Sequence, residues 1–93
     1  MGIGARRALV AESNRRVRQV IAAHLREDGF QVLAASSGLE ALLVLRRGTV
    51  DIALVDPMLP EIDGLELVRR VRRESTVTII MLNASRDDAA RIA

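Results

Sequence analysis

Residues 51–64, DIALVDPMLPEIDG, decide the fold of this chain. The apolar run Ile52–Val55 ends at an acid, Asp56, and a loop that contains both prolines of the chain follows. The run does not alternate with polar residues, which is typical of a strand buried on both faces of a parallel sheet. Asp63 with Glu66 three residues later forms a capping box, so a helix is predicted after the loop. The stretch is therefore a strand, a loop and a helix, with a carboxylate at the carboxyl end of the strand.

Three further apolar runs have the same character: Ala8–Ala11, Val32–Ala35 and Val77–Leu82. Each is continuous, so all four strands are expected to be buried on both faces of a parallel sheet. Segments long enough for helices separate them. Strands and helices that alternate in this way are joined by right-handed crossovers, which predicts a three-layer α/β domain.

Helices are predicted in the intervals between the strands and after the last strand, where the chain ends inside a helix. Start and stop signals frame them: the capping boxes Ser37 with Glu40, Asp63 with Glu66 and Ser85 with Asp88, and the glycines Gly29 and Gly48. The positions expected to face the core are Val17, Val20, Ile21, His24 and Leu25 in the first helix, Ala41, Leu42 and Leu45 in the second, and Leu67, Val68 and Val71 in the third.

Composition excludes several classes of protein. The chain has 93 residues, no cysteine and a single histidine, His24, so disulfide scaffolds, Cys-based zinc sites, His-cluster metal sites and Ser-His triads are excluded. All 14 basic residues are Arg, yet the net charge is only +2 and Phe30 is the one aromatic residue, which argues against direct nucleic-acid binding. No apolar run approaches the ~18 residues of a membrane span, and the N-terminus is no signal peptide, so a cytoplasmic domain without membrane contact is expected.

Polar residues follow each predicted strand. In open α/β sheets, sites form beyond the carboxyl ends of the strands. The residues there are Glu12 and Ser13, Ser36, Asp56, and Asn83 and Ala84. If the first and third strands are neighbours, Glu12 and Asp56 face each other and offer an oxygen-rich site for a divalent cation.

The loop that ends Leu59-Pro60-Glu61-Ile62-Asp63-Gly64 resembles the receiver domain of bacterial two-component response regulators, in which a strand ending in Asp is followed by Leu-Pro-x-x-Asp-Gly. The resemblance extends over essentially the whole chain. Other matching residues are Arg18, Ile21, Leu25 and Gly29, then Gly38, Glu40, Ala41 and Leu42, then Ile79–Leu82 with Asn83 and Ala84. It implies a flavodoxin-like parallel sheet in the order 2-1-3-4. Residues 1–93 would then be a receiver domain that is incomplete at its C-terminus, without the family's fifth strand and helix.

The resemblance also implies roles for individual residues. Asp56 would accept a phosphoryl group from a sensor histidine kinase with Mg²⁺. Glu12, Asp56 and the backbone carbonyl of Met58 would hold the metal, and the N–H groups of Met58 and Ala84 would bind the phosphoryl oxygens. Asn83 takes the position that responds to phosphorylation. The domain would be a signalling switch rather than an enzyme, and it would regulate an output domain or partner, for example in transcription.

The chain departs from the family pattern at four places. Ser13 replaces an acid that normally binds Mg²⁺ directly, so a weakened metal site is expected. Asn83 replaces a Thr or Ser. Pro57 directly follows the phosphoacceptor position and removes one N–H from the loop. The family's Lys, which lies on its fifth strand, has no counterpart, because the chain contains no Lys.

These departures keep other functions open. One is a pseudo-receiver, a phosphorylation-independent interaction module that forms a homodimer or a domain swap through the edge of the strand at 77–82. Another is a Mg²⁺-dependent hydrolase using Glu12 and Asp56, although no general acid or base is evident beside them.

Several polar residues are expected to be structural. Ser13 or Asn14 caps the first helix, and Asp63 with Gly64 forms a turn and a cap. Asp51 is expected in a turn or at the edge of a strand, and His24 is expected to be packed or half-exposed. The cluster Arg69, Arg70, Arg72 and Arg73 is expected to be a solvated helix face with Arg70 paired to Glu66, the alternative being a docking surface for an acidic partner.

Overall fold

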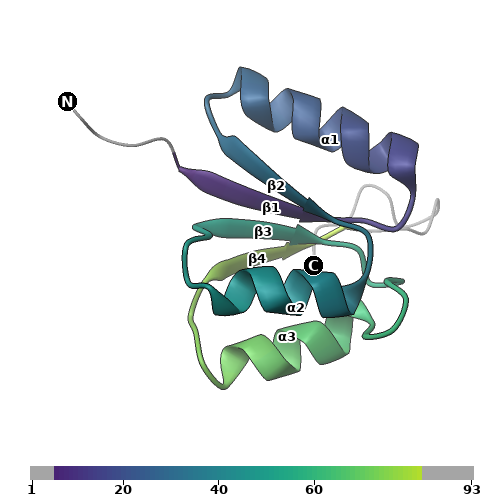
Figure 1. The fold of residues 1–93 in the computed structure, drawn as a ribbon, viewed down its shortest axis with the longest axis vertical. Helices are drawn as coiled ribbons and strands as arrows, with labels where there is room; N and C mark the ends of the chain where they lie inside the picture. Colours follow the sequence, from purple (N-terminus) through teal and green to yellow (C-terminus); the bar gives the residue numbers. More distant parts are fainter. Residues whose placement is uncertain (1–5, 83–93) are drawn as a thin grey trace.

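The computed structural model describes residues 6–82 as one parallel sheet with helices on both of its faces (Figure 1). Its strands are β1 (Arg7–Ala11), β2 (Gln31–Ala35), β3 (Ile52–Val55) and β4 (Thr78–Met81), and its helices are α1 (Arg15–Glu27), α2 (Gly38–Arg46) and α3 (Gly64–Arg72). The strand order β2-β1-β3-β4 confirms the predicted order. The predicted helix around Ser85 and Asp88 lies outside the described residues.

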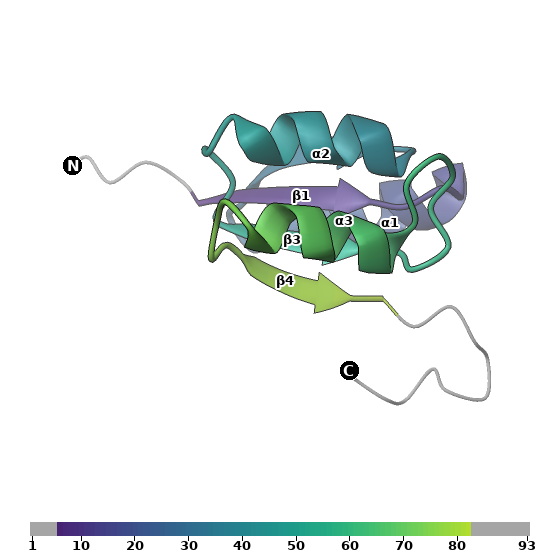
Figure 2. The same cartoon turned by 90° about the horizontal axis from the view of Figure 1, so that it is seen from below.

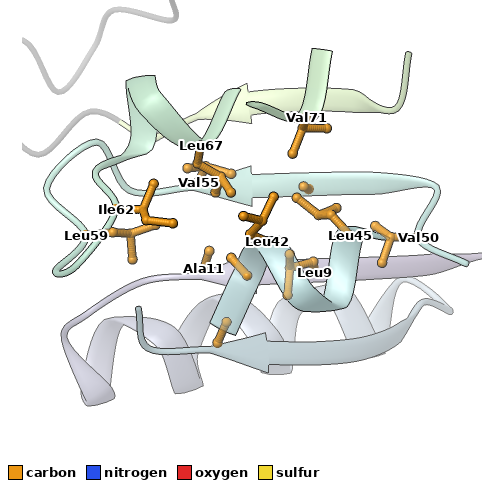
Figure 3. Close-up of a cluster of buried hydrophobic side chains, with 13 residues drawn as sticks. Leu9, Ala11, Leu42, Leu45, Val50, Val55, Leu59, Ile62, Leu67 and Val71 are labelled. Atoms are coloured by element: carbon orange, nitrogen blue, oxygen red, sulfur yellow. The ribbon is translucent and has the colours of Figure 1, made fainter. Parts of the chain in front are cut away.

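The main core lies between the sheet and the pair α2 and α3 (Figure 3). Leu9 and Ala11 of β1 belong to this cluster, together with Leu42 of α2 and Leu67 of α3. Ala8 and Val10, which alternate with them, are also fully buried but lie outside the cluster. Successive side chains of a strand point to opposite faces, so Ala8 and Val10 face the other side of the sheet, where α1 packs on β1 and β2.

The expectation that every strand is buried on both faces is wrong for two strands. The apolar residues of β1 are fully buried, but Ala34 of β2 is exposed and β4 alternates, with Ile80 37% exposed. β2 and β4 are the edges of the sheet formed by residues 6–82. The contacts of α1 are with β1 and β2, so the face of β4 that carries Ile80 does not share this cover.

The predicted apolar face of α1 is only partly correct. Val20 is 56% exposed, and Val17 and His24 are exposed too, whereas Ala22 is buried and Ile21 and Leu25 are half-buried. His24, expected to be packed or half-exposed, lies on the exposed side of α1. α1 is an outer helix that covers two strands through one narrow stripe, and helical spacing by itself does not mark the centre of that stripe.

Side-chain caps set the start of all three helices. Asn14, rather than Ser13, caps α1 by accepting a hydrogen bond from the N–H of Val17 at 3.0 Å. Ser37 and Asp63 cap α2 and α3 in the same way, as predicted. The reciprocal half of each capping box is absent in this part of the chain, because the Glu40 carboxylate accepts from the N–H of Ser36, one residue before the cap, and the Glu66 carboxylate accepts from Arg70 and Arg69.

The basic cluster on α3 is exposed, as expected of a solvated helix face. Arg70 lies 3.0 Å from Glu66, which confirms the predicted pair, and this hydrogen bond lowers the pKa of the Glu66 carboxyl. Asp51 is also structural, since its carboxylate accepts from the N–H of Arg7 at 2.7 Å and holds the start of β1.

Glu61 in the β3–α3 loop has a backbone conformation that side chains disfavour. Its φ is +72°, and the N–H of Ile62 donates to the carbonyl of Pro60 at 2.8 Å, which closes a tight turn around Glu61. Replacing Glu61 with Gly is expected to raise the free energy of unfolding by about 1 kcal/mol, since glycine adopts positive φ without a steric cost. Urea unfolding measures this gain. Glu61→Ala is the control, and an equal gain in the Ala variant would contradict the explanation.

Candidate functional site

The strands of the described sheet are all parallel, so their carboxyl ends gather at one edge. Figure 2 shows β1, β3 and β4 pointing the same way. Ala11 of β1 is in register with Val55 of β3, and the next residues along the chain are Glu12 and Asp56. The N–H of Asp56 donates to the carbonyl of Ala11 at 2.8 Å. Both acids are buried, Glu12 at 8% and Asp56 at 4% exposure. The prediction that the first and third strands bring these two acids together is confirmed.

Both carboxylate oxygens of Asp56 accept hydrogen bonds. The backbone N–H of Met58 donates to Oδ1 at 2.9 Å, and the hydroxyl of Ser13 donates to Oδ2 at 3.2 Å. The side chain of Met58 is 72% exposed, so this residue contributes to the site through its backbone alone. A buried carboxylate needs such partners, because an unpartnered charge in the interior is costly. Asp56 is therefore held in one orientation.

Glu12 is held beside Asp56 by its own set of contacts. Its carboxylate accepts from the N–H of Asn14 at 3.0 Å, and its N–H donates to the carbonyl of Ala35 at the end of β2. Burial raises the pKa of the Glu12 carboxyl above its ordinary value of 4.5, and the Asp56 carboxylate raises it further, while the Asn14 N–H and the charge of Arg18 act in the opposite direction. Two buried carboxylates thus lie near each other at this edge of the sheet.

The raised pKa of Glu12 predicts a pH-dependent gain on substitution. A folded pKa above the unfolded one means that the stability which Glu12 contributes is fully present below pH 4.5 and is lost as the pH rises through the folded pKa. Glu12→Gln removes this loss. The variant is therefore expected to be more stable than the wild type near neutral pH, with the difference vanishing below pH 4.5.

Urea unfolding at a series of pH values checks this prediction. Glu27→Gln is the matched control, since Glu27 is an exposed acid at the end of α1. A Glu12→Gln variant that is less stable than the wild type near neutral pH would show that ionised Glu12 is not destabilising.

The loop after Asp56 packs closely against Gly64, the first residue of α3. A side chain at Gly64 would place its Cβ 2.7 Å from the carbonyl oxygen of Asp56 and from the Cα of Pro57. The N–H of Gly64 also donates to the carbonyl of Pro57 at 3.1 Å. The Asp63-Gly64 pair therefore does more than form the predicted turn and cap, because its glycine lets α3 approach the backbone of Asp56 and Pro57.

Ser36, which also follows a predicted strand, does not join this group. The N–H and hydroxyl of Ser36 both donate to the Glu40 carboxylate, so Ser36 serves the start of α2. Asn83 and Ala84 lie outside the described residues. Sequence reasoning assigned Arg18 only to a helix, but its guanidinium donates to the carbonyl of Glu12 at 2.8 Å. The sequence did contain one sign of this role: Arg18 lies at helical spacing from Ile21, Ala22 and Leu25, on the buried side of α1.

The chemical type of the donors at this edge, oxygen atoms, is the type that a hard divalent cation prefers. They comprise the carboxylates of Glu12 and Asp56, with the backbone carbonyl of Met58 as the third predicted ligand. Within residues 6–82 no group of three or more His, Cys, Asp or Glu side chains could hold a metal ion. Ser13 stands at the predicted site as a hydroxyl that already donates to Asp56. The donor set therefore fits Mg²⁺, with less negative charge than three carboxylates would supply.

A parallel sheet with two acids at its carboxyl edge is typical of one family of proteins, and comparisons with known proteins identify the same family. The chain belongs to the response regulator receiver domain family, whose sequence model matches residues 8–93. It is similar to the transcriptional regulatory protein CseB of Streptomyces coelicolor, with 46% identity over 79 residues, 85% of this chain and 34% of that protein. It is also similar to AfsQ1, a transcriptional regulatory protein of the same organism, with 39% identity over 86% of this chain and 36% of that protein.

A solved structure has a similar fold. The chemotaxis protein CheY4 of Vibrio cholerae superposes with a TM-score of 0.79 and 26% identity, over 91% of this chain and 75% of that one. This chain spans about a third of the length of the curated relatives that it matches. No helix in the described part of the chain is long and apolar enough to cross a bilayer.

Proposed function

We propose that this chain is a signalling switch of a two-component system, in which Asp56 accepts a phosphoryl group from a sensor histidine kinase. The observation that carries the proposal is the state of Asp56: buried at the end of β3, held through both oxygens, and beside a second acid. A structural capping residue needs neither the second acid nor this burial. Family membership adds independent support.

The proposed chemistry is phosphoryl transfer to a carboxylate. An oxygen of Asp56 forms a bond to phosphorus while the bond between phosphorus and the donor nitrogen breaks, and the donor keeps that electron pair. Bound by Glu12, Asp56 and the carbonyl of Met58, Mg²⁺ would supply charge neutralisation and alignment. The N–H of Met58 donates to the Asp56 carboxylate, and it is the proposed hydrogen-bond donor to a phosphoryl oxygen. Asn83 and Ala84 remain proposed partners of that group.

Phosphorylation is proposed to act by shifting a population between two conformations that exist before it. The output is proposed to be regulation of transcription through a further domain or partner, because CseB and AfsQ1 are transcriptional regulatory proteins. The proposed setting is the cytoplasm, without direct nucleic-acid contact by this domain.

Intact mass after incubation with acetyl phosphate, with and without Mg²⁺, tests the proposal. We expect one phosphoryl adduct that depends on Mg²⁺ and maps to the peptide containing Asp56. Ser13→Asp restores a carboxylate, so it is expected to lower the Mg²⁺ concentration required for half-maximal labelling. Failure to label at any Mg²⁺ concentration, or labelling at another residue, would refute the assignment.

A second candidate is the pseudo-receiver, a homodimerisation module that works without phosphate. The observation that favours it is β4, which has one hydrogen-bonded neighbour within residues 6–82 and carries no charged side chain. Such an edge can pair with a second copy. Sedimentation at increasing protein concentration, with and without phosphodonor, separates the two candidates, since the pseudo-receiver dimer is unaffected by phosphorylation.

A further inference from the structure

Arg18 is the one residue of α1 in the described structure whose side chain hydrogen-bonds to the β1–α1 loop. It lies on the buried side of the helix and is itself half-buried. Its Nη1 donates to the carbonyl oxygen of Glu12 at 2.8 Å and to that of Ser13 at 3.5 Å, the second contact being the longer and weaker. A charged donor makes such a bond stronger than one between neutral groups.

These two carbonyls belong to the residues whose side chains build the site. The N–H of Glu12 donates to the carbonyl of Ala35 on β2, and Asn14 is the N-cap of α1. The peptide groups in between are the part of the loop that decides where the Ser13 hydroxyl points. Both carbonyls accept from Arg18, and the Ser13 hydroxyl donates to Oδ2 of Asp56.

We propose that Arg18 is a positioning residue of the phosphoryl site, which acts on Asp56 through the backbone of Glu12 and Ser13. Its guanidinium sets the loop conformation, the loop presents the Ser13 hydroxyl, and the hydroxyl orients the carboxylate. The kinetic part of this inference rests on the proposed phosphoryl acceptance, whereas the structural part does not. Arg18 has no contact with the reacting atoms, so it differs in kind from Asp56.

The test compares Arg18→Met with Arg16→Met. Both variants remove one positive charge from α1, but Arg16 is exposed and its side chain makes no hydrogen bond within residues 6–82. The first readout is the set of amide NMR shifts of Ser13, Asp56 and Met58 in the metal-free protein under native conditions. The second is the initial rate of labelling by acetyl phosphate at fixed Mg²⁺.

Arg18→Met is expected to move the amide signals of Asp56 and Met58 across the loop and to slow labelling about tenfold relative to Arg16→Met. Arg18→Lys keeps the charge on a similar stem, so it is expected to show smaller shifts at the same amides and to recover part of the rate. A role in stability alone would leave the native-state shifts at Asp56 and Met58 unchanged.

The inference is overturned if Arg18→Met and Arg16→Met give the same shifts at Asp56 and Met58. If Arg18→Met does not fold, Arg18→Lys decides: shifts confined to α1 overturn the inference, and shifts at Asp56 and Met58 support it. A wild type that takes up no phosphoryl group refutes the proposed function, while the amide shifts still decide whether Arg18 orients the site.

Discussion

Asp56→Asn is expected to abolish labelling by acetyl phosphate, lowering the rate by at least about a hundredfold. Asparagine preserves the shape of the side chain, and its amide oxygen can still accept a hydrogen bond from Met58 or Ser13. The neutral amide lacks the negative charge with which the carboxylate attacks phosphorus. Loss of labelling together with an intact fold would therefore identify the nucleophile rather than a structural defect.

Asp63→Asn is the matched control for this experiment. Asp63 belongs to the same loop and caps α3 through a 2.8 Å bond from the N–H of Glu66, a role that asparagine performs equally well. We expect Asp63→Asn to label at the wild-type rate. Intact mass distinguishes the two variants, and an Asp56→Asn protein that still gains one Mg²⁺-dependent phosphoryl group would disprove the assignment of Asp56.

Gly38→Ala is expected to have the largest effect on stability, lowering the free energy of unfolding by about 3 kcal/mol. Gly38 is the first residue of α2, and its added Cβ would lie 1.7 Å from the carbonyl oxygen of Ile62, which is backbone and cannot rotate away. The N–H of Gly38 also donates to the carbonyl of Pro60 at 3.0 Å. The substitution therefore forces the β3–α3 loop off α2.

Thermal unfolding measures this effect, and a loss of about 3 kcal/mol lowers the midpoint by more than about 10 °C in a domain of this size. Gly48→Ala is the comparison, since its Cβ would meet nothing within 4 Å and only its φ of +73° is unfavourable. We expect a loss of about 1 kcal/mol there. Equal losses at the two glycines would show that the loop does not pack tightly on α2.

Much of the fold could be predicted because it depends on local pattern. The four apolar runs became strands with nearly the predicted bounds, and the caps at Ser37 and Asp63 formed as expected. Hydrophobic run length and capping chemistry act over a few residues, so they can be recognised in the sequence. The pairing of Glu12 with Asp56 followed from one further assumption, that the first and third strands are neighbours.

Burial could not be predicted as well, because it depends on which neighbours an element finds. Val20 and Ile80 have the hydrophobicity of core residues, yet both are exposed in the described structure. α1 covers two strands through a narrow stripe, and β4 is an edge of the sheet. Neither fact is encoded in the periodicity of α1 or in the composition of β4.

From the sequence we could derive the strand and helix pattern, the acid at the end of β3 and the family to which the chain is similar. The details of the site depend on tertiary structure. The hydroxyl of Ser13 donates to Asp56, burial raises the pKa of Glu12, and the guanidinium of Arg18 donates to the Glu12 carbonyl in the β1–α1 loop. The physical reason is the separation along the chain over which each kind of interaction acts. Propensities and caps act between near neighbours in the chain, whereas Ser13 and Asp56 are 43 residues apart and meet only through the pairing of β1 with β3.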